Sequence, residues 1–364
     1  MKKFLLVFVL FAGVFALSAC GPKTFEIAMI TDKGDIDDKS FNQGTWEGIV
    51  EFATENNKTH KYYKPLEVSN TAYVDAIDLA VAGGAKIVVT PGFLFQEAVH
   101  IAQIKYPDVK FVLIDGYPHD GSWTPDVRDN TTSIFFKEHE SAFLAGYAVV
   151  KDGFTNLGFF GGMAVPAVQR FGTGFVAGAY LAAQEMGVTL NFPATRYHYF
   201  GDFIATDEFK NMAASWYSSG TQMIHVAAGG AGNSVMAAAQ EGANRWVVGV
   251  DVDQKDQSVR VVTSAMKGLA TAVQKALTDF YADEFEGGEI ITLGAAEDGV
   301  GLPLDFSRFT TFNQAAYDTL FAKLVDGTIV VPSNYPELIA FATAKGITAD
   351  LTIFSESNLG GQTA

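Results

Sequence analysis

An acidic loop near the start of the chain, from Asp32 to Asn42, holds the side chains best suited to chemistry. It carries four carboxylates and ends on an aromatic followed by an amide, Phe41 and Asn42. An aromatic face can stack on a planar ligand, and an amide can donate and accept hydrogen bonds at the ligand's edge. We therefore interpret Phe41 and Asn42 as ligand-binding residues.

A calcium site is one alternative for this loop, but the spacing contradicts it. An EF-hand loop requires a bidentate Glu at its last position. That position falls on Gln43 when it is counted from Asp32, and on Trp46 when it is counted from Asp35. The loop is therefore not expected to bind calcium as an EF-hand does.

The calcium motif of nucleoside hydrolases, Asp-x-Asp-x-x-x-Asp-Asp, also fails. With Asp37 and Asp38 as its final pair, its earlier carboxylates fall on Thr31 and Lys33. A structural interpretation remains open for Asp35, Asp37 and Asp38. They would form a solvated helix start in which the acidic side chains favour the helix dipole and the Ser40 hydroxyl caps.

Short apolar runs alternate with helical patterns along the chain, which predicts βαβ units and parallel sheets. We expect strands at residues 25–30, 86–90, 110–115, 156–160, 222–227 and 245–251. We expect helices at residues 42–56, 141–151 and 171–186, and the last two are rich in Ala and Gly, so they should pack closely on sheets. No long linker is evident, so several crossings should join two lobes.

Open parallel sheets bind ligands beyond the carboxyl ends of their strands. The residues at these positions are small or polar: Thr31-Asp32, Pro91-Gly92, Asp115-Gly116, Gly161-Gly162, Gly229-Gly230 and Asp251. This set suits a ligand that carries hydroxyl groups.

Motifs for catalysis and cofactors are poorly represented. The segment from Gly229 to Gly232 lacks the spacing of a dinucleotide or triphosphate loop, and no G-x-S-x-G sequence is present. The histidines His119, His139, His198 and His225 are scattered without the spacing of metal ligands. The sequence predicts no enzyme, no cofactor and no metal site.

The N-terminus has the pattern of an export signal. Lys2 and Lys3 precede an apolar run over residues 4–19, which is short for a membrane span. The run ends on Leu17-Ser18-Ala19-Cys20, and Cys20 is the only cysteine. This segment resembles the lipobox of bacterial lipoproteins, so we expect cleavage before Cys20 and two acyl chains that anchor the protein. No thiol would then remain for a disulfide, for catalysis or for a metal.

Length and charge narrow the class of protein. Removing residues 1–19 from the 364 leaves 345, which favours two domains. The net charge is −16, and it becomes −18 once Lys2 and Lys3 are removed. Nucleic-acid binding is disfavoured because phosphate neutralisation needs a basic surface. We interpret the acidity as solubility at a membrane surface.

The segments together closely resemble the basic membrane protein family of ABC-transporter lipoproteins, which includes bacterial purine nucleoside receptors. The opening motif is TDKGDIDDKSFNQGTWEG at residues 31–48. In collinear order follow PGFLFQEAV (91–99), FVLIDG (111–116), the helix start at 140–146, VAAGGAGN (226–233), VVGVDVDQ (247–254) and TSAMK (263–267). The resemblance implies the type I periplasmic-binding-protein fold, an α/β fold of two Rossmann-like lobes joined by three crossover strands.

The resemblance also implies which residues would bind a nucleoside base. Phe41 and Phe171 would sandwich the base, Asn42 would bond to its edge, and Asp115 would accept a hydrogen bond from it. Phe171 keeps the alternative of a core aromatic, because residues 169–172 match the family only loosely.

Four further residues are implied for the rest of the ligand. Asp251 and Lys267 would hold ribose hydroxyls, while Asp32 and Gly230 would complete the polar lining. A surface helix lysine is the alternative for Lys267.

The predicted units are a signal peptide at 1–19, a lipidated tether at 20–24, a first lobe at 25–133 plus 253–298, a second lobe at 134–252 plus 299–348 and a tail at 349–364. We expect a monomeric, extracytoplasmic, lipid-anchored protein that closes on a nucleoside, with a purine favoured. It would deliver this ligand to the permease and ATPase subunits of an ABC importer. A sugar or signalling-sugar receptor of the same fold is the alternative, and a secreted nucleoside hydrolase is less favoured.

Overall fold

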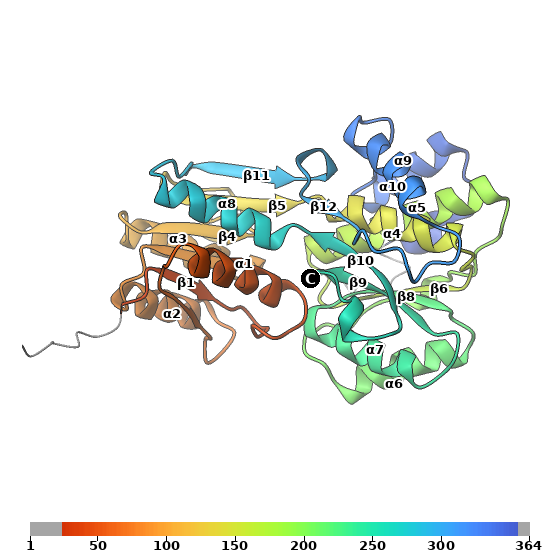
Figure 1. Ribbon diagram of the computed structural model, residues 1–364, viewed down its shortest axis with the longest axis horizontal. Coiled ribbons are helices and arrows are strands. Elements are labelled where there is room, and N and C mark those ends of the chain that lie inside the picture. The colour runs from red at the N-terminus through yellow and green to blue at the C-terminus, as the bar shows by residue number, and fades with distance from the viewer. Residues whose placement is uncertain (1–23, 356–364) are drawn as a thin grey trace, which may run out of the picture.

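The computed structural model describes residues 24–355 as two α/β lobes, each built on a six-stranded sheet (Figure 1). The first sheet has the order β11-β5-β4-β3-β1-β2, and every pairing in it is parallel. Its strands are β1 (Ile27–Ile30), β2 (His60–Tyr63), β3 (Ile87–Pro91), β4 (Lys110–Ile114), β5 (Thr131–Phe136) and β11 (Glu289–Leu293). Its helices are α1 (Phe41–Glu55), α2 (Asn70–Ala82), α3 (Gln96–Lys105) and α8 (Leu269–Tyr281).

The second sheet has the order β12-β10-β9-β8-β6-β7, and only the short edge strand β12 runs antiparallel to its neighbour. Its strands are β6 (Leu157–Gly161), β7 (Tyr197–Tyr199), β8 (Met223–Ala227), β9 (Trp246–Asp251), β10 (Val261–Lys267) and β12 (Val300–Gly301). Its helices are α4 (Glu138–Lys151), α5 (Pro166–Met186), α6 (Asp207–Ser218), α7 (Gly232–Gln240), α9 (Gln314–Val325) and α10 (Tyr335–Lys345).

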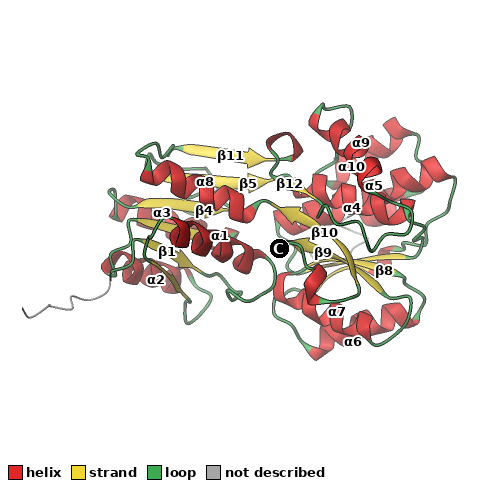
Figure 2. Cartoon of the chain, viewed as in Figure 1, coloured by secondary structure: helices red, strands yellow, loops and turns green. Residues whose placement is uncertain are grey.

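Helices cover both faces of each sheet, and the strand sequences show why (Figure 2). In β1, Ile27 and Met29 belong to the apolar cluster that includes α1 and α8, whereas Ala28 and Ile30 belong to the cluster under α2 and α3. Successive side chains of a strand point to opposite faces, so a strand buried on both faces is apolar throughout. The predicted α/β class with parallel sheets is confirmed.

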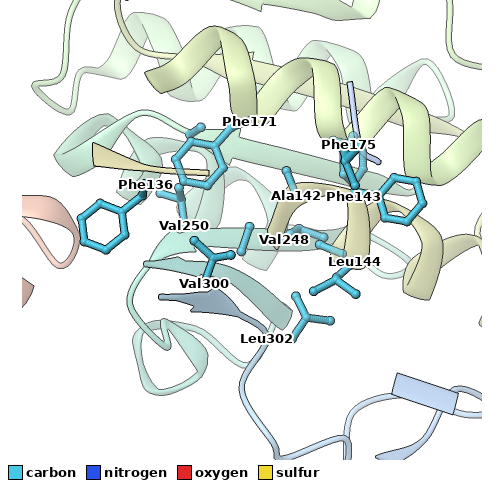
Figure 3. Close-up of a cluster of buried hydrophobic side chains, with 14 of the residues drawn as sticks. Phe136, Ala142, Phe143, Leu144, Phe171, Phe175, Val248, Val250, Val300 and Leu302 are labelled. Carbon is cyan, nitrogen blue, oxygen red and sulfur yellow. The ribbon is translucent and has the colours of Figure 1, made fainter. Parts of the chain in front are cut away.

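Helices α4 and α5 approach each other very closely, and glycine permits this contact. A Cβ atom on Gly178 would lie 2.0 Å from the Phe143 carbonyl oxygen, and one on Gly146 would lie 2.3 Å from the Phe175 carbonyl oxygen. Their small residues were predicted to bring these helices close to sheets, whereas these two glycines bring the helices close to each other. Figure 3 shows the buried side chains around this contact, including Phe143, Phe171 and Phe175.

The chain passes between the lobes three times: after β5, after β10, and between β11 and β12. Several crossings were expected, and the structure has them. The predicted first lobe, however, included residues 253–298, and within that range β10 belongs to the second lobe because it pairs with β9. Parallel neighbours usually need a helical crossover, and only residues 252–260 connect these two, so the sequence lacked that signal. The predicted tail also differs, because Leu351 and Phe354 are buried in the second lobe.

Candidate ligand-binding site

A cavity between the lobes lies at the carboxyl ends of the strands and encloses about 720 Å³, counting its open mouth. The first lobe contributes the turns after β1 and β3, which is where the strand order reverses in such sheets. Every residue that the sequence assigned to a ligand lines this one cavity: Asp32, Phe41, Asn42, Asp115, Phe171, Gly230, Asp251 and Lys267.

The start of α1 is capped by Asp38, which is only 9% exposed. Its carboxylate accepts hydrogen bonds from the backbone N–H groups of Ser40, Asn42 and Gln43 at 2.8–3.1 Å. The predicted cap, the Ser40 hydroxyl, makes no such bond and instead donates to Asp251 in the other lobe at 2.5 Å. Asp38 is therefore a buried capping residue at the cavity and not part of a solvated helix start.

Asn42 is held in one orientation by two carboxylates. Its side-chain NH₂ donates to Asp32 Oδ1 at 3.0 Å and to Asp38 Oδ2 at 3.1 Å. A flipped amide would place its oxygen against both carboxylates, which repel it. The Asn42 Oδ1 atom is buried without a hydrogen-bond partner, so Asn42 offers the cavity a hydrogen-bond acceptor.

Lys267 is the charged centre of the cavity and lies at the end of β10, buried, which excludes a surface helix lysine. Its Nζ atom is 2.5 Å from Asp115 Oδ2, 3.2 Å from Glu138 Oε1 and 3.9 Å from Asp251 Oδ1. Glu138, fully buried at the crossing after β5, also accepts from Arg170 Nε at 2.5 Å. The other oxygen of Asp115, Oδ1, is buried without a partner.

Burial and charge compete in this cluster. Burial raises the pKa of Asp251 to about 6, with the positive charge of Lys267 opposing the shift. Burial likewise raises the pKa of Asp115 against the same ammonium. Burial alone would raise the pKa of Glu138, but Lys267 and Arg170 together hold that pKa below its usual value. Burial would lower the pKa of Lys267, but the surrounding carboxylates raise it well above its usual range.

Asp115 and Asp251 share an uncommon backbone conformation, with φ of 60° and 65°. Each is placed where a strand of one sheet ends, and the left-handed region is disfavoured for residues with a side chain, although Asp tolerates it better than most. Such residues concentrate at functional sites, where the surrounding structure maintains the strain. Both carboxylates thereby reach the cavity.

Aromatic rings from both lobes flank the Lys267 ammonium. Its Nζ atom is 4.8 Å from the centroid of Phe41, which is half-buried, and 5.5 Å from that of Phe171, which is 2% exposed. Phe171 is thus a core aromatic and a cavity wall at once, and Figure 3 shows it among buried side chains that include Val250. Phe203, which the sequence did not single out, adds a third ring from the loop after β7.

Four polar contacts join the lobes around the cavity. Besides the Ser40–Asp251 bond and the Lys267–Asp115 ion pair, Gln254 donates to the carbonyl oxygen of Lys39 at 2.7 Å. Lys33 and Asp202 form an ion pair at 2.7 Å. The lobes are therefore closed on each other in this structure.

Several residues at the cavity or behind its wall had no specific signal in the sequence. Asp38 was seen only as part of an acidic loop, and Glu138 and Arg170 belong to unremarkable helical segments. The turn that carries Phe203 follows the short strand β7, and a search for residues after strands could have found it.

The described part of the chain contains neither a metal-ligand cluster nor a membrane-spanning helix. Among residues 24–355, no group of three or more His, Cys, Asp or Glu side chains is placed to hold a metal ion. No helix within that range is long and apolar enough to cross a membrane. Cys20 and the signal segment lie outside the described residues.

Comparisons with known proteins agree with this geometry. Residues 25–334 match the model of the Bmp family, described as "ABC transporter substrate-binding protein PnrA-like". A Lactococcus lactis subsp. cremoris (strain MG1363) protein named "ABC transporter nucleoside-binding protein BmpA" is 32% identical over 330 residues, which cover 84% of this chain and 89% of the relative. The "CD4+ T-cell-stimulating antigen" of Listeria monocytogenes serovar 1/2a (strain ATCC BAA-679 / EGD-e) is 32% identical over 333 residues, covering 86% and 89%. A solute-binding protein of an ABC transporter system from Aeropyrum pernix K1 shares the fold, with a TM-score of 0.73 at 23% identity and coverage of 89% and 98%.

Proposed function

Because this chain belongs to the Bmp family of PnrA-like ABC transporter substrate-binding proteins, we propose that its ligand is a nucleoside, with a purine favoured. The protein is a receptor of an ABC importer and not an enzyme. Its two lobes close around the ligand and release it to the permease. The nucleoside is supported by the cavity chemistry and by the name of the Lactococcus lactis relative.

One observation carries the proposal: two rings from different lobes flank a space that also holds unpaired acceptors. Phe41 belongs to the first lobe and Phe171 to the second, and both rings are close to the Lys267 ammonium. Asn42 Oδ1 and Asp115 Oδ1 are buried without partners, and an unsatisfied buried acceptor is costly. A planar base that carries N–H donors supplies both the stacking face and the missing hydrogen bonds. A free sugar has no planar aromatic face that could stack on these rings.

The hydroxyls of the ribose suit the other side of the cavity. An ionised Asp251 can accept two hydroxyl donors, and bonds to an ionised acceptor are stronger than neutral ones. Lys267 supplies a donor nearby and is already oriented by its carboxylate partners.

The experiment is a calorimetric titration of the mature protein, purified in detergent, with inosine, guanosine, adenosine, uridine and free ribose. We expect the purine nucleosides to bind most tightly and ribose least. At a hundred times its dissociation constant, a nucleoside should stabilise the protein by about 2.7 kcal/mol in a parallel melting experiment. Ribose that bound as tightly as inosine would support a sugar receptor instead.

We also propose that Cys20 carries the lipid that holds the receptor on the outer side of the membrane. The support is the segment Leu17–Cys20 and the absence of any other cysteine. Cys20→Ser should abolish incorporation of labelled palmitate and leave the precursor uncleaved or released. Equal labelling of this variant would refute the anchor.

A further inference from the structure

The polar lining of the cavity is dominated by carboxylates. Asp32, Asp38, Asp115 and Asp251 line it, and Lys267 is the one Lys or Arg side chain among the described lining residues. These four carboxylates form two patches in different parts of the cavity. Asp32 and Asp38 come from the turn that leads into α1, while Asp115 and Asp251 surround the ammonium. A ligand therefore meets a carboxylate at each polar patch, in whichever orientation it binds.

The cationic groups near the cavity are already neutralised. Three carboxylates surround the Lys267 ammonium, those of Asp115, Glu138 and Asp251. Arg170, behind the cavity wall, pairs with Glu138. Five carboxylates thus face two cations, counting Asp32 and Asp38. Among the described residues that line the cavity, no unpaired Lys or Arg remains to balance an additional anion.

The helix starts at the cavity compensate for this excess of carboxylates only in part, since a helix N-terminus carries roughly half a positive charge. A free helix N-terminus attracts anions through its N–H groups, but Asp38 occupies those of α1. Helix α5 begins on Pro166, which has no N–H, so this helix start has one donor fewer than usual and keeps those of Ala167 and Val168 at the cavity. The turn at Gly230 faces Asp38 as well, since a Cβ atom built on Gly230 would lie 3.9 Å from Asp38 Cβ.

We propose that this cavity rejects phosphorylated ligands and that Asp38 is a specificity-determining residue for the rejection. The proposal rests on the nucleoside ligand proposed above and adds that the corresponding nucleotides are excluded by charge. Like charges brought together in a water-poor site cost several kcal/mol. At about 1.4 kcal/mol per tenfold change in affinity, a nucleoside 5′-monophosphate should bind at least about 100-fold more weakly than its nucleoside.

The consequence is a place in a reaction sequence. A nucleotide outside the cell becomes a ligand only after hydrolysis of its phosphomonoester. In that reaction water adds to phosphorus, the bond from phosphorus to the 5′ oxygen breaks, and inorganic phosphate and the free 5′ hydroxyl are formed. A phosphomonoester hydrolase acting on the outer side of the membrane must therefore supply this receptor whenever nucleotides are the source.

The test measures dissociation constants of the full mature protein in detergent for three matched probes: inosine, inosine 5′-monophosphate and inosine 5′-O-sulfamate. The sulfamate has nearly the bulk of the phosphate but no charge. We expect inosine and the sulfamate to bind within about tenfold of each other, and the monophosphate to bind at least about 100-fold more weakly than inosine. This comparison uses the unmutated protein, so it does not depend on the folding of a variant.

Asp38→Asn then tests the residue. It removes the charge at nearly constant shape, and the ratio of monophosphate to inosine dissociation constants should fall at least about tenfold. Asp37→Asn is the matched control, because Asp37 is the exposed neighbour outside the cavity lining, and its ratio should not change.

Each contrary result has a different meaning. Equal binding of inosine and its monophosphate would overturn the proposal and leave the nucleoside function standing. A sulfamate as weak as the monophosphate would show that bulk and not charge excludes phosphate, which also overturns it. If Asp38→Asn leaves the ratio of monophosphate to inosine dissociation constants unchanged, Asp38 is not the residue that determines the rejection of phosphate. Failure of all three probes, together with failure of guanosine, adenosine and uridine in the calorimetric titration, would refute the nucleoside function itself.

Discussion

Phe41→Ala should weaken nucleoside binding and destabilise the unliganded protein only about half as much as truncation of a fully buried Phe would. Phe41 is the first residue of α1, half-buried, with one side packed on the core and its ring near the Lys267 ammonium. Stacking of a base on an aromatic side chain contributes about 1–3 kcal/mol, so the dissociation constant should rise by roughly 5-fold to 150-fold. Complete burial of a Phe would make truncation cost about 3–5 kcal/mol of stability. For a half-buried ring we expect about half of that.

Phe171 and Trp46 provide the comparisons. Phe171 is 2% exposed, so Phe171→Ala should cost the full 3–5 kcal/mol or so of stability and also weaken binding. Trp46 lies on α1 like Phe41 and is half-buried, but it packs on His60 and Tyr62 away from the cavity. Trp46→Ala should lower the melting temperature and leave the affinity unchanged.

The assay pairs calorimetric affinities with melting temperatures of the unliganded variants. Phe41→Trp should keep most of the affinity, because stacking needs a flat face more than a particular side chain. The reasoning is refuted if Phe41→Ala destabilises the empty protein as much as Phe171→Ala does and leaves the affinity intact. Phe41 would then be a core residue, and the strongest reason to prefer a nucleoside over a sugar would be lost.

Four further outcomes are expected. Burial raises the Asp251 pKa to about 6, and only an ionised Asp251 can accept two ribose hydroxyls. Nucleoside affinity should therefore fall as the pH drops below about 6. Calorimetry at stepped pH should show this fall for the unmutated protein and no such fall for Asp251→Asn. The same group should make the unliganded protein less stable as the pH rises from about 4 to 6, by about 3 kcal/mol, so Asp251→Asn should remove that slope from urea unfolding curves. Lys33→Met should speed ligand dissociation roughly twofold in stopped-flow measurements by removing the ion pair with Asp202 that joins the lobes, whereas Lys64→Met, which removes an ion pair within the first lobe, should not. Glu138→Ala should lower the free energy of unfolding by about 3 kcal/mol, because it leaves buried positive charge unpaired, and an unchanged urea midpoint would contradict this.

Much of the fold could be predicted because its signals are local. The apolar runs placed β1, β3, β4, β6, β8 and β9 within about two residues, since a strand buried on both faces must be apolar throughout. The limits of the lobes were less accessible. Strand β10 was assigned to the wrong lobe because the choice of sheet depends on pairing with β9, a contact that its own residues do not encode.

By itself the sequence determined the α/β architecture and the family resemblance, and the resemblance implied eight residues that meet in one cavity. Four of them, Asp32, Asp115, Gly230 and Asp251, could also be read from the chain, because parallel strands bring their carboxyl ends to one edge. Only the tertiary structure decided how these side chains are used. It turned Ser40 from a helix cap into a donor to Asp251, 211 residues away, and buried Asp38 so that it orients Asn42. It also placed Glu138 between Lys267 and Arg170. These contacts depend on the tertiary arrangement of the two lobes, and no local pattern of residues predicts which side chains it brings together.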